Sequence, residues 1–93
     1  MFTLSKPNMI TSDEGYSVEI LGRTGLEYRE GNKSMFVDSE VLGVGHGIVI
    51  FSRSMRTWRA PNENEVITEK KRGDIIKNIR LAIEFQKQPV EVQ

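Results

Sequence analysis

Residues 68–86 most constrain the fold, because they are the only part of this 93-residue chain with the length and periodicity of a full helix. At about 100° per residue, the apolar side chains fall within one arc of roughly 120°, and most charged and amide side chains lie outside it. The arc contains Ile75, Ile76, Ile79, Ala82 and Ile83. Burying its isoleucines at about 1.5–3 kcal/mol each would be a large gain for a small domain, so we expect this stripe to cover a sheet.

The two ends of this helix are also indicated by the sequence. Thr68 has the hydroxyl of a good N-cap residue, and Glu69 would lie favourably at the positive end of the helix dipole. Pro89 biases Gln88 away from helical angles, so the helix should end by Lys87.

Residues 25–38 predict a β-hairpin, because Gly31 and Asn32 suit the positive φ angles of a two-residue turn. Such a turn fixes the register of the paired residues. The predicted pairs are Glu30 with Lys33, Tyr28 with Met35, and Leu26 with Val37. Phe36 falls on the other face among polar residues, and we expect a loop or the N-terminal arm to cover it.

Further strands are expected at residues 17–21, 48–51 and 90–92. The continuous apolar run at 48–51 is typical of a central strand that is covered on both faces. We interpret the sequence Asp38-Ser39-Glu40 as a turn after the hairpin. The pattern predicts an α+β fold, in which a small antiparallel sheet of about four or five strands packs against one C-terminal helix.

The length of the chain fits one domain. Residues 1–15 contain several turn-forming residues, and we expect them to be a loosely ordered N-terminal arm on a single α+β domain at residues 16–93. The chain has no cysteine, no apolar run of membrane-spanning length and no signal-peptide pattern. We therefore expect a cytoplasmic protein that does not interact with membranes.

The sequence contains no recognisable catalytic or metal-binding constellation. Gly43, Gly45 and Gly47 are spaced like glycines of a phosphate-binding loop, but a strand follows them instead of a helix, so a bulge or wide turn is the better interpretation. His46 is the only histidine, and it would become a catalytic candidate only if the fold placed it beside Asp38 or Glu40 in a deep pocket. We expect no enzymatic activity, no cofactor and no metal site.

A group of arginines around a tryptophan is the best candidate for a binding surface. The candidate partner-binding residues are Arg53, Arg56, Trp58 and Arg59, with Glu63 and Glu65 on the adjoining loop. The guanidiniums could pair with carboxylates of a protein or with phosphates, and the indole could stack on bases. For Trp58 we favour a position in the core, because a single tryptophan in so small a domain usually supplies buried area.

Taken in order, several segments resemble the bacterial immunity protein 74 family over about residues 16–92. They are Leu21-Gly22-Arg23-Thr24-Gly25-Leu26 with Tyr28, residues 36–42, residues 47–51, Ser54-Met55 with Trp58 and Pro61, and the isoleucine-rich helix. Members often have two prolines after the tryptophan, where this chain has Ala60-Pro61. The resemblance implies a small α+β protein of polymorphic toxin systems that binds and neutralises a cognate toxin without enzymatic activity. It transfers no set of binding residues.

Two functions remain open from the sequence. The first is an immunity-type protein that neutralises a protein toxin by stoichiometric occlusion. The second is a small nucleic-acid-binding or regulatory module that uses the arginine-tryptophan group. The uneven charge of the chain also motivates this hypothesis, because the first 45 residues hold seven acidic and four basic side chains. The formal net charge of zero disfavours nucleic acid as a partner. The oligomeric state is left open.

Overall fold

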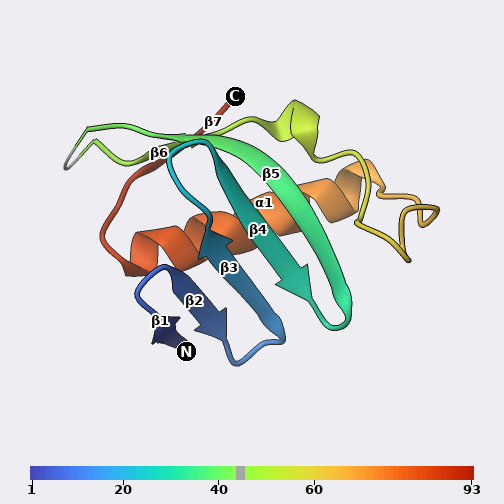
Figure 1. The fold of residues 1–93 in the computed structure, drawn as a ribbon, viewed down its shortest axis with the longest axis horizontal. Helices are drawn as coiled ribbons and strands as arrows, with labels where there is room; N and C mark the ends of the chain where they lie inside the picture. Colours follow the sequence, from blue (N-terminus) through green and yellow to red (C-terminus); the bar gives the residue numbers. More distant parts are fainter. Residues whose placement is uncertain (44–45) are drawn as a thin grey trace.

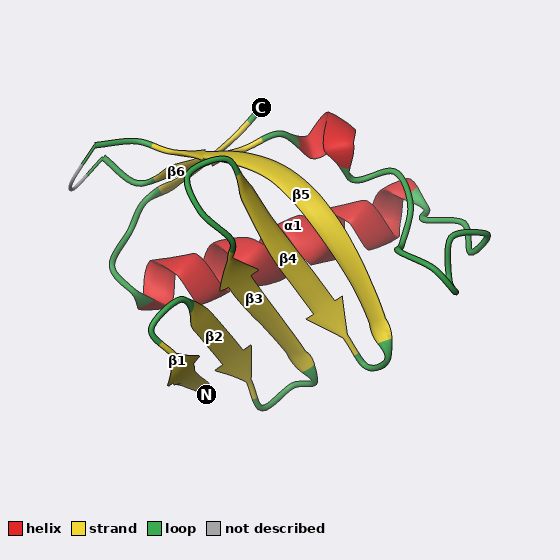
Figure 2. Ribbon diagram, viewed as in Figure 1, coloured by secondary structure: helices red, strands yellow, loops and turns green. Residues whose placement is uncertain are grey.

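In the part of the chain that the structure describes, a curled sheet and one helix form two layers (Figures 1 and 2). The computed structural model describes residues 1–43 and 46–93. The strands are β1 (Phe2–Lys6), β2 (Met9–Ser12), β3 (Tyr16–Ile20), β4 (Gly25–Glu30), β5 (Lys33–Val41), β6 (Ile48–Ile50) and β7 (Val90–Val92). A 3₁₀ turn, η1 (Ser52–Ser54), and the helix α1 (Glu69–Phe85) complete the described elements.

Within the described residues, seven strands follow one another across the sheet in chain order. Neighbouring strands from β1 to β6 are antiparallel, and α1 carries the chain back so that β7 lies parallel to β6. The prediction of one C-terminal helix packed on a sheet is confirmed. The expected number of four or five strands is wrong, and so is the expectation that all of them are antiparallel.

The extra strands come mainly from residues 1–15, which we expected to form a loose arm. Pro7 and Asn8 form a tight turn between β1 and β2. Ile10 is buried opposite Val18 of β3. Asn8 also binds β3, because its side-chain amide donates to the Ile20 carbonyl at 2.8 Å and its carbonyl accepts from the Ile20 amide at 2.8 Å. The strand pairing of β2 with β3, the buried Ile10, these two hydrogen bonds and the packing of Phe2 against Tyr16 and Phe85 hold the segment in place.

The hairpin of β4 and β5 has the predicted register, with Leu26 opposite Val37 and Tyr28 opposite Met35. However, β5 does not end where the hairpin was expected to end. The sequence Asp38-Ser39-Glu40 continues the strand and pairs with β6, so its interpretation as a turn is wrong. The apolar residues of β6 are buried on both faces as predicted, although β6 is the last strand but one rather than a central strand.

The isoleucine stripe of α1 packs on one face of the sheet. Its buried members are Ile75, Ile79, Ala82 and Ile83, and they share a core with Val18, Leu26, Tyr28, Met35, Val37 and Ile50. The hydroxyl of Thr68 accepts a hydrogen bond from the Lys71 amide at 3.0 Å, which confirms the predicted N-cap. The orientation predicted for the helix is therefore correct.

Trp58 belongs to the core. It is 2% exposed, and its ring centroid lies 6.3 Å from that of Tyr28, which in turn lies 5.9 Å from that of Tyr16. The ammonium group of Lys33 lies 5.4 Å from the centre of the Trp58 ring. The interpretation of Trp58 as a core side chain is confirmed.

A polar network joins the helix to β4. Asn78 donates to the Tyr28 hydroxyl at 2.9 Å, that hydroxyl donates to Glu30 at 2.7 Å, and Lys71 also donates to Glu30. Burial raises the pKa of the Tyr28 phenol well above its usual range. Burial alone would raise the pKa of Glu30 as well, but hydrogen bonds from Lys71 and Tyr28 outweigh it and hold that pKa below its ordinary value.

Gly47 is a glycine because of a close backbone approach. Its φ is +86°, and a β-carbon added there would lie 2.1 Å from the carbonyl oxygen of Pro89, just before β7. The backbone at Gly47 therefore requires glycine, although the reason is the approach of the segment before β7 rather than the bulge or wide turn that was expected. Gly45 lies outside the described residues.

Replacing a buried helix residue should test the orientation of α1. Ile79→Asp should lower the free energy of unfolding by roughly 3–5 kcal/mol, because it buries an unpaired carboxylate. Lys77→Asp, at an exposed position two residues earlier, should change it by less than about 0.5 kcal/mol. Urea denaturation measures both. Equal losses in the two variants would contradict the packing of α1 on the sheet.

The lowered pKa of Glu30 predicts a pH-dependent contribution to stability. Because the folded pKa lies below the unfolded one, this contribution is fully present above the unfolded pKa and is lost as the pH falls through the folded pKa. Glu30→Gln should therefore destabilise by about 1–3 kcal/mol at neutral pH and by much less in acid. Urea denaturation at about pH 7 and about pH 3 measures the difference, with the exposed Glu84→Gln as control. A loss that is the same at both pH values would refute this role of the Glu30 charge.

Candidate protein-binding face

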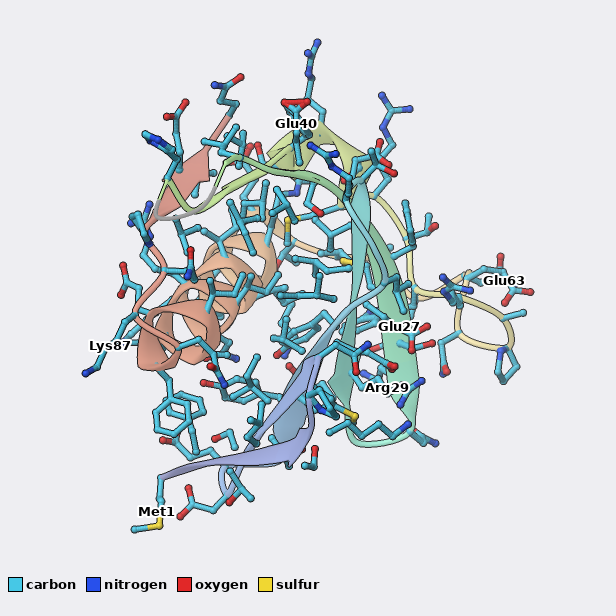
Figure 3. The ribbon with its side chains drawn as sticks, turned by 60° about the vertical axis from the view of Figure 1, so that its left-hand side comes forward. Met1, Glu27, Arg29, Glu40, Glu63 and Lys87 are labelled. Atoms are coloured by element: carbon cyan, nitrogen blue, oxygen red, sulfur yellow. The ribbon has the colours of Figure 1, made fainter. Side chains whose placement is uncertain are left out.

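Polar side chains alternate with core residues along the strands and gather on the side of the sheet away from α1, which we call the open face. Figure 3 shows Glu27 and Arg29 on this side of β4. The alternation and the strand register place on the open face Met9, Ser17, Glu19, Glu27, Arg29, Ser34, Phe36, Asp38 and Glu40. The exposed side chains of this face lie on β4 and β5, so a partner can approach the sheet there.

Two carboxylates and two guanidiniums form a charge network on the open face. Glu19 and Glu27 lie directly opposite each other on β3 and β4, an unfavourable placement for like charges. Arg29 offsets it, because its Nη2 lies 2.5 Å from Glu27 Oε1 and 3.6 Å from Glu19 Oε1. Arg59 adds a second contact, with its Nε 3.4 Å from Glu27 Oε2. The nearly buried Glu27 therefore holds both arginines in defined positions.

Phe36 is a partly exposed aromatic side chain beside this network. It is 39% exposed, and the guanidinium of Arg59 lies 5.8 Å from its ring centre. The ring lies so close to the backbone of Gly25 that a β-carbon there would be 2.5 Å from it. The expectation that the N-terminal arm covers Phe36 is wrong, because β1 and β2 lie at the far edge of the sheet. The expected cover by a loop is present only in part, through Arg59, which belongs to the loop after η1.

Further along β5, the open face is hollowed. A hollow of about 500 Å³ is lined by Asp38, Phe51, Arg53, Ser54 and Arg56. The hydroxyl of Ser54 accepts from the Asp38 amide at 2.9 Å and donates to the Phe51 carbonyl at 2.7 Å, so η1 is fixed against β5 and β6. Arg56 Nε donates to the Arg53 carbonyl at 3.1 Å. Both arginine side chains are exposed at the hollow.

A comparison with protein families identifies one that matches most of the chain. The family model described as immunity protein 74 matches residues 17–93. The chain belongs to the immunity protein 74 family. The match includes every open-face residue from Ser17 onward and leaves out β1 and β2. Comparisons with curated proteins and with solved structures gave no match.

In this immunity protein 74 family member, the candidate arginines of the sequence lie on or beside the open face. Arg53 and Arg56 line the hollow, and Arg59 lies over Phe36. Trp58 is buried, so its ring is not available for stacking on a base or for filling a pocket of a partner. Its contribution to this surface is to support the chain between η1 and Arg59.

The two candidate glutamates lie apart from the arginines that line the hollow. Glu65 forms an ion pair with Lys33 at 2.5 Å, near the hairpin turn. Glu63 is exposed on a loop that extends away from the sheet, as Figure 3 shows. These two residues therefore belong to a loop beside the open face and not to the hollow.

Several open-face residues were missed as site candidates. The hairpin register already placed Glu27 and Arg29 on the same face as Phe36. What the sequence did not reveal is that β3 brings Glu19 opposite Glu27, and that the chain after η1 returns Arg59 to β5, where its amide donates to the Ser34 carbonyl at 2.8 Å.

Two further findings concern residues 1–43 and 46–93. No group of three or more His, Cys, Asp or Glu side chains in them is arranged to hold a metal ion. No helix there is long and apolar enough to cross a membrane. His46 is exposed in the loop before β6 and does not line the hollow with Asp38.

The charge network should be measurable as a coupling between Arg29 and Glu19. Arg29→Met should destabilise by about 1–2 kcal/mol at low salt, because it leaves Glu19 and Glu27 opposed. In a protein that already carries Glu19→Gln, Arg29→Met should lower the free energy of unfolding by clearly less. Urea denaturation of the four proteins gives the coupling energy, with the exposed Arg23→Met as control. If the losses simply add, Arg29 does not offset this repulsion.

Proposed function

We propose that this protein binds a cognate protein toxin and neutralises it by occlusion, without catalysing a reaction. The observation that carries this proposal is the family match over residues 17–93. Immunity proteins of this kind need a stable surface complementary to one partner, and they need no reactive groups.

The open face is the surface that best suits this role. Specific protein complexes bury about 1,200–2,000 Å² in total and rely on a few aromatic and arginine anchors. Phe36 and Arg59 form such a pair, and the arginine is already positioned by Glu27 before a partner arrives. A side chain that is held in place before binding loses less conformational entropy in the complex.

A nucleic-acid-binding function receives less support from the fold. Trp58, the proposed stacking residue, is buried. The open face interleaves its arginines with Glu19, Glu27, Asp38 and Glu40, which would repel a run of phosphates. We therefore favour a protein over a nucleic acid as the partner of the open face.

Co-expression with the products of the genes beside this one tests the proposal, which expects a toxin among them. The protein should restore growth, and it should form a complex with an inactive toxin variant on size-exclusion chromatography. Phe36→Asp should raise the Kd by about 10- to 100-fold, because it removes an interface anchor. Leu81→Asp is the matched control, since Leu81 is 43% exposed on the helix and Phe36 is 39% exposed on the sheet.

The possible results separate the function from the surface. Absence of both growth rescue and a complex would refute the proposed function. A complex that Leu81→Asp weakens and Phe36→Asp leaves unchanged would show that the toxin binds the helix side instead of the open face.

A further inference from the structure

The four arginines around the open face fall into two classes. Arg29 and Arg59 both contact Glu27, so their charges are offset inside the protein. Arg53 and Arg56 take part in none of the ion pairs found in the part of the chain that the structure describes. Their guanidiniums are exposed at the hollow, where a group from outside can reach them.

The hollow is built from fixed elements. Ser54 joins η1 to β5 through the Asp38 amide and caps the turn through the Phe51 carbonyl. The hydrogen bond from Arg56 Nε to the Arg53 carbonyl uses one of the five guanidinium donors and leaves the others free. The structure thus places two donor-rich side chains on a short, well-anchored turn beside one hollow.

We propose that this hollow is a subsite for one carboxylate side chain, an aspartate or glutamate presented by the toxin. This inference rests on the proposed function and names the chemistry of the group that the open face recognises. Guanidiniums bind carboxylates through paired, charge-assisted hydrogen bonds, which give both energy and orientation.

The charges lining the hollow set the charge of the group that fits. Arg53 and Arg56 contribute two positive charges, and Asp38 on the wall formed by β5 contributes one negative charge. One carboxylate would bring the subsite to neutrality. Phe51 adds an aromatic surface, against which the aliphatic part of the incoming side chain packs.

A nucleic-acid backbone fits this subsite less well than a protein side chain. Successive phosphates would have to pass Asp38 and Glu40, which lie on the same face of β5. A protein can present one acidic residue and place basic or neutral residues around it.

The test uses binding of the full chain to a purified, catalytically inactive form of the neighbouring toxin. The pair Arg53→Glu/Arg56→Glu should raise the Kd by at least about 100-fold at low salt, because it replaces attraction by repulsion. Lys77→Glu/Lys87→Glu, at exposed positions on α1 and just after it, changes the net charge equally and should leave the Kd within about threefold. Arg53→Gln/Arg56→Gln keeps polar side chains at both positions and should give an intermediate loss.

A reciprocal experiment identifies the recognised group. Acidic surface residues of the toxin are changed one at a time to arginine. The Kd of each toxin variant for the Arg53→Glu/Arg56→Glu variant is then measured. One of these changes should restore binding by about 10-fold or more, as expected for a direct charge pair.

Three results would overturn the inference. If wild type binds the toxin and Phe36→Asp weakens binding while both Arg53/Arg56 variants bind normally, the proposed function stands and the subsite does not. If wild type does not bind the toxin, the proposed function itself fails. If a labelled RNA or DNA oligonucleotide binds wild type at low salt and loses affinity in the glutamate variant, the arginines recognise phosphate instead.

Discussion

The packing of one isoleucine stripe against one face of a sheet governs the rest of the structure. Burial of Ile75, Ile79 and Ile83 joins the helix to strands contributed by most of the chain. In the described residues, α1 covers one side of the sheet, and along β4 and β5 the other side bears exposed side chains that must be stable in contact with water. It achieves this with paired charges between β3 and β4, and these charges also form the surface available to a partner.

β4 connects the core to this surface. Tyr28 points toward the helix and joins the hydrogen bonds from Asn78 and to Glu30, whereas its neighbours Glu27 and Arg29 point to the open face. The strand is thereby fixed on both sides. A rigid strand is a suitable base for recognition, because side chains positioned by packing lose little freedom when a partner binds.

The open face combines two properties that a specific binding protein needs. Its internal pairs, such as Arg59 with Glu27, set the shape of the surface before association. The arginines at the hollow keep their hydrogen-bonding capacity for a group from outside. A surface with mixed charge also discriminates against partners of uniform charge, since an incorrectly placed acidic group would meet the exposed carboxylates of Asp38 or Glu40.

Local chemistry alone determined the α1 cap at Thr68, the hairpin register around Gly31 and Asn32, and the buried side of the helix, because each depends on residues a few positions apart. The sequence could assign Phe36 to the face opposite Tyr28, but it could not show whether anything covered that face. Contacts between residues distant in the chain decided how far the Phe36 face is covered. They also decided that β1 and β2 join the sheet and that Arg59 approaches Glu27. Strand alternation identifies two faces, and only the complete packing selects which one is left exposed to solvent.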